Sequence, residues 1–233
     1  MIGITGKRHS HMKDRTDKTG ARGEQAADEI PQRLRERLYP VVLDLFSRSD
    51  FYQVNLREIS RESGLSTSTI YRYFSSKEEL LFTILNEKLS EIRELVRVHI
   101  QGLESTREIL RKILWVTMDF YDRNPGVAIT SFITVPMRTW MREESFIRED
   151  ERNVLVEIVT AARRRRDIDL SIEVREFFDI YYMICYRTIY TWYYHGMRWK
   201  LVDTIPGFLD RIWRMLAPPD DPGHGTGKKH PRN

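Results

Sequence analysis

Small hydroxyl residues, tyrosines and a lysine are concentrated in one short stretch of this 233-residue chain. Residues 62–80 read ESGLSTSTIYRYFSSKEEL: one glycine, a run of hydroxyl side chains, and then three aromatic residues in four positions. Such side chains donate and accept hydrogen bonds without bulk, which suits the base edges of a nucleic acid and the phosphates beside them. The composition therefore indicates a nucleic-acid contact.

Helix signals on both sides of this stretch indicate which elements must position it. Asn55 followed by Glu58, and Ser76 followed by Glu79, have the spacing of a capping box, in which the first side chain caps a helix start. Gly64 is a natural C-terminal stop for the helix that begins after Asn55. The sequence therefore predicts one short helix before Gly64 and a long helix after Ser76.

A further short helix between these two completes a helix-turn-helix. Ser66 can cap it, and it runs through Phe74. Two short helices joined by a glycine-containing turn have the form of this motif over residues 56–74. Helical spacing predicts a buried set, Ile59, Leu65, Ile70 and Phe74. It predicts an outward set, Thr67, Ser68, Tyr71 and Arg72.

The outward set has the properties of a recognition helix in a major groove. Short polar groups at its N-terminal end allow the backbone to approach base edges. Tyrosine hydroxyls can reach the flanking phosphates. Lys77 and the free N–H groups at the start of the next helix form a phosphate site at the other edge of the groove.

The rest of the chain also has helical periodicity. A helix begins near Pro31, and Pro40 within it should kink it or delay its start. Further segments lie near 105–123, 126–143, 147–165, 172–197 and 204–216, and Pro136 interrupts the second of them. No alternating strand pattern occurs, so the predicted class is all-α.

At this point the residues resemble a family. The segment LREISRESGLSTSTIYRYFSSKEELL, preceded by LDLF, is similar to the DNA-binding segment of the tetracycline-repressor (TetR) family of bacterial regulators. The match covers about fifty residues and consists of Leu45-Phe46, Ile59-Ser60, Gly64-Leu65-Ser66, Tyr71-Arg72-Tyr73-Phe74, Ser76-Lys77 and Glu79-Leu80. Three positions depart from the pattern, one of them the unusual Pro40. Asp50 replaces a frequent glycine and, like Pro40, concerns the position of the first helix. Thr67 replaces a small residue or lysine, so no base preference carries over.

The resemblance implies a division of the chain and a set of DNA contacts. It implies a three-helix DNA-binding domain over 29–78 and a larger helical ligand-binding and dimerisation domain over 79–217. Residues 1–28 form a basic arm and residues 218–233 a flexible tail. Contacts to double-stranded DNA are implied for Asn55, Thr67, Ser68, Tyr71, Tyr73 and Lys77, while Arg72 reaches a guanine or a phosphate.

The larger domain contains candidates for a ligand pocket. Aromatic and methionine side chains cluster around the breaks near Pro125 and Pro136, and such linings suit a bulky apolar ligand with a polar end. The assigned residues are Trp115, Met118, Tyr121, Phe132, Met137, Trp140, Phe177 and Tyr181. The alternative is that these residues are plain hydrophobic core, as aromatic residues at helical spacing usually are.

Two C-terminal segments indicate a homodimer. FFDIYYMICYRTIYTWYYHGM is too aromatic all round for a one-sided surface helix, and with IPGFLDRIWRML it suits a four-helix interface across a two-fold axis. The assigned interface residues are Tyr190, Trp192, Phe208, Ile212 and Trp213. Burial within one subunit is the alternative for about half of these side chains.

Composition argues against several other classes. With only one cysteine, Cys185, the chain can form neither an internal disulfide nor a cysteine zinc site, which fits the cytoplasm. No apolar run approaches the length of a membrane span. No catalytic motif, cofactor site or metal-ligand spacing is present, so we expect no enzyme. The four arginines of 163–166 suit a helix C-terminus, although they could bind an anion.

These observations lead to one functional hypothesis and one alternative. The hypothesis is a ligand-responsive, sequence-specific transcriptional regulator. As a repressor, it would be released from a palindromic operator by a fatty-acyl thioester, an aromatic or a drug-like compound. The alternative is a DNA-binding regulator without a small ligand, controlled by a protein partner. Coupling is expected where the long helix after Ser76 meets Trp115 and Tyr121.

Overall fold

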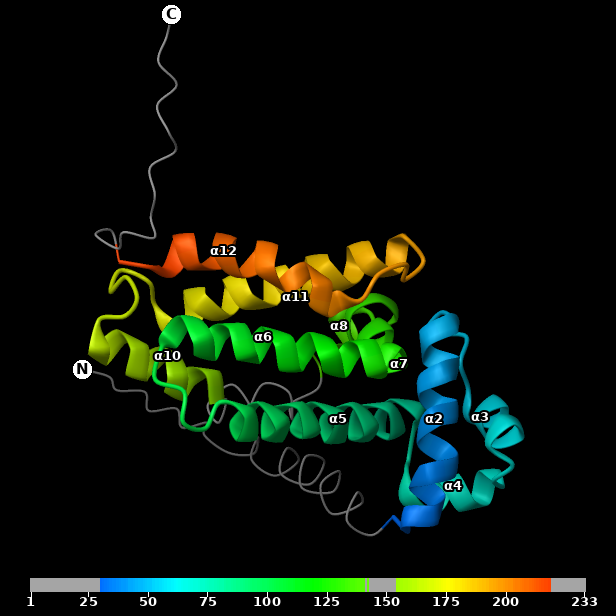
Figure 1. The fold of residues 1–233 in the computed structure, drawn as a ribbon. Coiled ribbons are helices and arrows are strands. Elements are labelled where there is room, and N and C mark those ends of the chain that lie inside the picture. The colour runs from blue at the N-terminus through cyan, green and yellow to red at the C-terminus, as the bar shows by residue number, and fades with distance from the viewer. Residues whose placement is uncertain (1–29, 141, 143–153, 219–233) are drawn as a thin grey trace, which may run out of the picture.

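The computed structural model describes residues 30–140, 142 and 154–218, and every regular element among them is a helix. At one end α2 (Gln32–Arg48), α3 (Leu56–Ser63) and α4 (Thr67–Tyr73) form a three-helix head. Figure 1 shows α2 crossing the ends of the longer helices, with α3 and α4 on its outer side. The all-α class and the helix-turn-helix head are those that the sequence predicts.

The longer helices form a layered body next to the head. They are α5 (Lys77–His99), α6 (Thr106–Arg123), α10 (Val154–Arg165), α11 (Val174–Tyr194) and α12 (Ile205–Leu216). In Figure 1 α5, α6 and the α11–α12 pair lie one above the other with nearly parallel axes. Contacts between α5 and α6, and between α6 and α12, bury the apolar faces of these helices. No helix in the described part is both long and apolar enough to cross a membrane.

The apolar side chains of the head form its core as the helical spacing predicts. Ile59, Ile70 and Phe74 are fully buried, and Phe46 of α2 joins them. Leu65 is half-buried and packs against the same cluster. The short helices α3 and α4 are therefore held by tertiary packing, because isolated helices of this length are not stable in water.

Two predicted helix caps are present, but in one of them the glutamate side chain accepts from a different residue than a capping box predicts. Asn55 Oδ1 accepts the N–H of Glu58 at 3.1 Å, and Ser76 Oγ accepts the N–H of Glu79 at 3.0 Å. The Glu79 carboxylate does not return to Ser76. It accepts the N–H of Ser75 at 2.7 Å. The box therefore also fixes the residue before the cap, where the chain turns from α4 into α5.

Pro40 lies inside α2, which runs without a break from Gln32 to Arg48. The sequence predicted a kink or a delayed start, and the helix instead begins well before the proline. Pro40 is exposed, so the helical carbonyl that it leaves without an N–H donor can meet water.

The segment predicted as one interrupted helix over 126–143 contains three elements. They are α7 (Pro125–Ile129), a π-helix η1 (Thr130–Thr134) and the short α8 (Met137–Trp140). Within η1, Val135 N donates to Thr130 O at 3.3 Å, the i to i+5 bond of a π-helix. The break at Pro136 agrees with the prediction, but the π-helix was not foreseen, because no sequence pattern in this segment distinguishes it from α-helix.

The other helices predicted from the sequence are present in the structure, but their first or last residues differ from the predicted bounds. Of the segment 147–165, only the part from Val154 lies within the described residues, as α10. The last segment begins with a 3₁₀ turn, η3 (Leu201–Thr204), before α12. The basic arm 1–28, and the tail after Pro218, lie outside the described residues.

The arginine run ends α10 and binds within the protein. Arg165 Nε lies 2.8 Å from the Asp167 carboxylate, and Arg165 Nη2 donates to Thr106 Oγ1 at 2.8 Å. Arg163 donates to the carbonyl of Ile172. These contacts fasten the C-terminus of α10 to the start of α6, in keeping with the structural interpretation of the run rather than an anion site.

Candidate DNA-reading head and ligand cavity

The outer face of α4 is polar. Tyr71 is 58% exposed, and Ser68 and Arg72 are exposed as well, while Thr67 and Tyr73 are half-buried. The structure therefore brings five of the residues assigned to DNA contact onto one short helix. Thr67 is less accessible than the outward position predicted for it.

The hydroxyl groups at the start of α4 are hydrogen-bonded to one another. Ser66 Oγ accepts the N–H of Thr69 at 3.0 Å and caps the helix. The same oxygen lies 2.8 Å from Ser68 Oγ and 2.7 Å from Thr69 Oγ1. Because these groups are small and already oriented, the N-terminal end of α4 can approach a groove closely.

The turn between α3 and α4 is held by α2. Arg37 Nη2 donates to the carbonyls of Ser63 at 3.0 Å and Gly64 at 3.1 Å. Gly64 has φ 65°, the left-handed conformation that favours glycine at a helix C-terminus. A Cβ at this position would lie 2.8 Å from the end of the Arg37 side chain, so a larger residue would strain the backbone and would also displace the guanidinium from these carbonyls.

Lys77 supports the head from inside. Its Nζ donates to the carbonyl of Phe51 at 2.7 Å and of Val54 at 2.8 Å, and it lies 4.9 Å from the centre of the Phe51 ring. Partial burial lowers the pKa of this lysine. The ammonium was assigned to a phosphate, but it points at the loop before α3. The carbonyls of that loop need a donor that no helix supplies.

Asn55 is also occupied within the head. Its side chain caps α3 through Glu58, and its Nδ2 donates to the carbonyl of Gln53 at 3.4 Å. Asn55 is nevertheless exposed at the surface of the head. Its placement fits a role in setting the start of α3 as much as the DNA contact assigned to it.

A carboxylate of α5 fastens the head to the body. Glu87 accepts the phenol of Tyr39 at 2.9 Å and pairs with Arg35 at 3.4 Å. Burial and the adjacent Glu87 raise the pKa of Tyr39 well above its ordinary value. Tyr39 and Arg35 belong to α2, so these bonds join α5 directly to α2.

The body contains a cavity of about 650 Å³ that is open to solvent on one side, and its volume lies within the ~300–1,000 Å³ usual for small-molecule sites. Its walls come from α5, α6, η1, α8, α10 and α11, and most of the lining side chains are aliphatic or aromatic. Residues predicted for a ligand pocket that line it are Tyr121, Phe132, Met137, Trp140 and Tyr181.

Three residues predicted for the pocket lie elsewhere. Ile113, Thr117 and Tyr121 face the cavity at four-residue spacing on α6, so Trp115 and Met118 fall on other faces of the same helix. The ring of Trp115 is partly exposed and lies beneath Lys112 Nζ at 5.4 Å. Met118 is buried in the core. The pocket assignment is therefore wrong for these two side chains in this structure.

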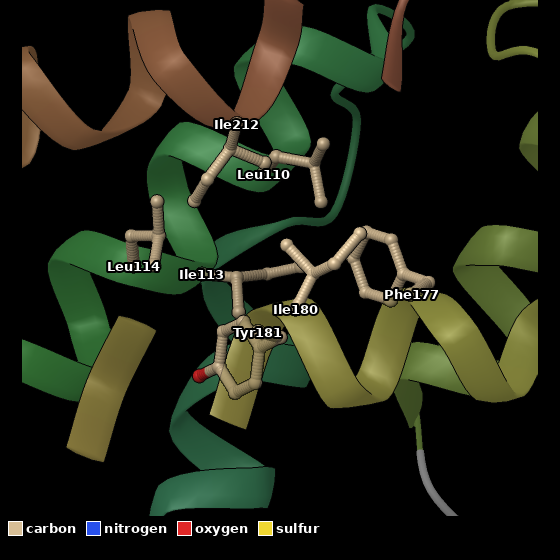
Figure 2. Close-up of a pocket in the computed structure, with 7 residues that line it drawn as sticks. All are labelled: Leu110, Ile113, Leu114, Phe177, Ile180, Tyr181 and Ile212. Atoms are coloured by element: carbon tan, nitrogen blue, oxygen red, sulfur yellow. The ribbon is translucent and has the colours of Figure 1, made fainter. Parts of the chain in front are cut away.

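Phe177 lines a separate and much smaller gap. Figure 2 shows this gap between α6, α11 and α12, with the Phe177 ring at one side and Tyr181 turned toward α6. Its volume is about 10 Å³, too small for anything larger than a water molecule. Ile113 and Tyr181 line both spaces, so these two side chains form the partition between the gap and the cavity.

Polar groups of the cavity wall gather on α6 and α11. Thr117 Oγ1 and the Tyr181 phenol oxygen lie 3.1 Å apart. Cys185 stands one helical turn after Tyr181 on α11 and lines the same cavity, as does Tyr121 of α6. Ser131 of η1 lines the same cavity, and its Oγ is buried without a hydrogen-bond partner in the described part of the protein.

Burial keeps the ionisable groups of this wall neutral. It raises the pKa of the Cys185 thiol to about 12, and the neighbouring Tyr181 offsets only part of that effect. Burial likewise raises the pKa of Tyr121 and of Tyr181 far above the ordinary range. The wall is therefore a set of neutral hydrogen-bonding groups in apolar surroundings at any physiological pH.

Sequence reasoning missed Thr117, Ser131, Cys185 and Arg93, which all line the cavity. For Thr117 a signal was available, since it stands four residues before Tyr121 on a helix already assigned to the pocket. The other three come from separate elements, and only the tertiary structure brings them to one space.

The helices that border the cavity also touch the head. Both α7 and η1 pack on α2, and η1 reaches α11 on its other side. At the α7 contact the two helices approach each other closely. A Cβ on Gly126 would lie 3.3 Å from the Cβ of Leu43. The π-helix thus stands directly between the cavity and the first helix of the head.

Part of the face predicted for dimerisation is exposed. Tyr186, Tyr190 and Tyr194 form a stacked ladder along α11, with ring centres 6.2 and 6.4 Å apart. Phe208 and Trp213 of α12 are half-buried. By contrast Trp192 and Ile212 are buried within their own chain, and the Trp192 indole donates to the carbonyl of Trp199 at 2.9 Å. The interface assignment is therefore wrong for Trp192 and Ile212, which helix periodicity turns inward.

Comparisons with known proteins support the interpretation of the head. Residues 43–84 match the family model described as bacterial regulatory proteins, tetR family. The regulator HbdR of Aromatoleum sp. (strain CIB), an HTH-type transcriptional regulator, is 25% identical over 172 residues, which cover 68% of each chain.

Solved structures show the same fold. The fatty acid degradation regulator FadR from Bacillus halodurans superposes with a TM-score of 0.72 at 14% identity, over 79% of this chain and 96% of that one. FadR from Bacillus subtilis, solved in complex with stearoyl-CoA, gives 0.69 at 17% identity, over 76% and 96%. These relatives are transcriptional regulators and not enzymes. The helix-turn-helix, the family match over residues 43–84 and the all-helical fold together support a TetR-family bacterial transcriptional regulator.

Proposed function

We propose that this protein is a dimeric cytoplasmic repressor that a bulky apolar molecule releases from a palindromic operator. One observation carries the proposal. The cavity of about 650 Å³ is lined in part by η1, and η1 packs on α2 of the DNA-reading head. A ligand in the cavity and DNA at the head therefore act on the same small group of elements.

DNA reading is assigned to α4. In this proposal Ser68 and Thr67 approach base edges, while Tyr71 and Tyr73 donate to the phosphates on either side. Arg72, exposed at the end of the helix, contacts a guanine or a phosphate. Lys77 and Asn55 act by holding the loop before α3 in place, because their polar atoms are bonded there.

The effector proposed for the cavity is a bulky apolar molecule such as a fatty-acyl thioester. The lining supports this class because Arg93 is the only fully charged side chain among the described residues that form it. The stearoyl-CoA bound to FadR of Bacillus subtilis, a protein of the same fold, adds support. An aromatic or drug-like compound of similar size remains within the proposed class.

A homodimer is proposed through α11 and α12. The exposed tyrosines of α11, with the half-buried Phe208 and Trp213 of α12, offer a surface rich in aromatic residues that a second copy would cover. Two reading heads then face half-sites about 34–36 Å apart, one turn of DNA, which requires a palindrome. We take 29–78 as the reading head and 79–217 as the body.

Release requires that the ligand favours a conformer in which the heads no longer match the half-sites. The bonds of Glu87 to Tyr39 and Arg35, and the contact of Gly126 with Leu43, are the two links through which α5 and α7 act on α2. These links replace the hinge near Trp115 that the sequence suggested, because Trp115 is partly exposed and does not line the cavity.

A selection on fragmented genomic DNA at near-physiological salt tests the proposal. We expect a palindromic site bound at nanomolar concentration, and release of that site when a long-chain acyl thioester is added. Tight operator binding that no apolar compound weakens would favour control by a protein partner. Only diffuse, salt-sensitive binding with protein shown to be ligand-free would refute the reading-head assignment itself.

A further inference from the structure

The open side of the cavity has an apolar rim. Among the described residues that line the cavity, four are exposed, namely Met137 on α8 and Tyr182, Met183 and Tyr186 on α11. Met183 is 64% exposed, so it stands at the opening rather than in the inner wall. An apolar molecule bound in this space by one chain would therefore keep contact with water at the rim.

The rim continues into the face of α11 that is proposed for the dimer. Tyr186 belongs to both, because it borders the cavity and also begins the stacked ladder with Tyr190 and Tyr194. Figure 1 shows α11 and α12 as the outer layer of the body, on the side away from α5. A molecule seated on the ladder would thus lie next to the opening of the cavity.

The exposed side chains of this face have the composition of a protein–protein interface. Between residues 182 and 194 they are five tyrosines, one methionine and one arginine. These three residue types are enriched in interfaces, whereas lysine, aspartate and glutamate are depleted there, and the segment contains none of the last three. The Arg187 guanidinium lies 5.7 Å from the centre of the Tyr190 ring, so the one charge is itself stacked on an aromatic residue. A second copy of this chain fits such a surface, since the same patch meets itself across a two-fold axis.

We propose that the second subunit of the dimer closes the opening of the cavity, so that the effector is bound between two copies of the chain. The inference rests on the proposed function, since it takes the α11 face as the dimer interface. It goes further by making the dimer, rather than the single chain, the unit that binds the effector. The two-fold axis makes the contribution mutual, because each copy then covers the cavity of the other.

Closure of the opening affects both equilibria. Small-molecule sites usually bury about 70–90% of the ligand surface, and an open side leaves part of an alkyl chain in water. A subunit that covers the rim therefore raises the affinity for an apolar ligand. By linkage, the ligand raises the affinity between the subunits by the same factor. A cavity closed within one chain would leave the two equilibria independent.

Thiol labelling of the full-length protein tests the closure without any ligand. Met183→Cys places a thiol on the rim, and Tyr52→Cys, at a position 75% exposed in the head, is the matched control. The natural Cys185 is buried with a raised pKa, so it reacts slowly in both variants. We expect the Met183→Cys thiol to react about tenfold more slowly once about nine-tenths of the chains are dimeric, because only the monomer exposes it. The Tyr52→Cys rate should not change.

A variant that weakens the dimer tests the linkage. Tyr194→Glu places a charge on the α11 face without touching the cavity, because Tyr194 is exposed and does not line it. We expect this change to weaken dimerisation in sedimentation. In calorimetry it should also weaken the binding of undecanone, used as an apolar probe, by about fivefold to a hundredfold. Tyr52→Glu is the control and should change neither quantity.

The outcomes separate this inference from the proposed function. A Met183→Cys thiol that reacts equally fast in dimer and monomer, or undecanone affinity that is the same in both, would overturn the closure and leave the proposed dimer and effector class standing. A chain that is monomeric at every concentration would overturn the inference together with the proposed dimer. Protection of the Met183→Cys thiol in a dimer that does not bind undecanone would support the closure and count against the proposed effector class.

Discussion

Gly126 at the start of α7 is packed so closely on Leu43 of α2 that a methyl group at position 126 would lie 3.3 Å from the Leu43 Cβ. Adding that methyl should push α7 away from α2 by a few tenths of an ångström. We expect Gly126→Ala to lower operator affinity about threefold to tenfold, since overpacking of this kind costs ~1–3 kcal/mol and would fall on the head–body contact.

Fluorescence anisotropy with operator DNA measures this effect. Gly207→Ala is the matched control, because a Cβ on Gly207 of α12 meets nothing within 4 Å. If both glycine variants bind the operator like the parent protein, the α7–α2 contact does not control the head.

Arg72 distinguishes two kinds of DNA contact at the end of α4. If its guanidinium meets a phosphate, Arg72→Gln should weaken binding to all sequences and reduce the slope of log affinity against log salt by about 0.9. If it meets a guanine, the slope should change little, and discrimination at one base pair should fall by ~1–3 kcal/mol. Titrations at several salt concentrations against the operator and single-base variants measure both quantities.

Arg111→Gln provides the control for the Arg72 experiment. Arg111 lies on α6, is exposed, and pairs with Glu108 at 2.6 Å, away from the head. The Arg111→Gln variant therefore loses the same positive charge as Arg72→Gln, but it loses no proposed DNA contact. If Arg72→Gln behaves like Arg111→Gln in both titrations, Arg72 does not touch DNA.

Lys77 should matter more for stability than its position at a helix start implies. Lys77→Met keeps the aliphatic packing on Phe51 but leaves two loop carbonyls without their donor. We expect a loss of ~1–3 kcal/mol in the free energy of unfolding, measured by urea denaturation. Lys88→Met on the same helix removes only a surface pair with Glu91 and should cost less than ~1 kcal/mol. Equal losses in the two variants would count against the support role.

Cys185 gives the protein a specific pH dependence. Burial raises its folded-state pKa to about 12 from an ordinary value of 9.0, so the unfolded chain loses the thiol proton first. Stability from this group is therefore fully present below the unfolded pKa and declines as pH rises beyond it, by at most ~1.4 kcal/mol per pH unit.

Denaturation between about pH 8 and 10 isolates this effect, because tyrosines in unfolded chains titrate near 10. The parent protein should lose stability across this window faster than Cys185→Ala does. Parallel curves for the two proteins would show that the thiol is not shielded as the structure indicates.

Ile113 controls the size of the ligand space. With Tyr181 it separates the small gap of Figure 2 from the main cavity. Ile113→Ala should join the two, at a cost of ~2–5 kcal/mol in stability. The alkyl chain length that binds most tightly should then increase, as a series of ketones in calorimetry would show. Ile109→Ala, buried on the same helix but lining neither space, should lose stability without changing the preferred length.

The head could be predicted almost completely from local signals. Asn55, Ser66 and Ser76 cap the three helices they precede, and Gly64 ends α3, because each of these effects depends on residues close in sequence. The contacts of Lys77 could not be predicted from local signals. Its partners Phe51 and Val54 lie more than twenty residues away, and their carbonyls are left open by a loop whose path the sequence does not specify.

The cavity could be predicted only in part. Tyr121 and Phe132 were assigned to the pocket because aromatic residues near the breaks at Pro125 and Pro136 indicate irregular packing, and both line the cavity. Trp115 and Met118 were misplaced because a helix has several apolar faces when neighbours surround it, and periodicity does not say which face meets which neighbour. The same ambiguity explains Trp192, whose indole is bonded to Trp199 inside its own chain.

The π-helix at Thr130–Thr134 amounts to one additional residue in a helical turn. Deleting a single residue there would let the segment return to α-helical bonding, but each residue of an α-helix turns by about 100°. Everything after the deletion would rotate by that angle relative to α7, and Trp140 would no longer face the cavity that it now lines. A homologue that is one residue shorter in this segment would thus have a differently shaped binding space, even if every lining residue were the same. Effector specificity can therefore be compared residue by residue only between proteins in which this segment has the same length.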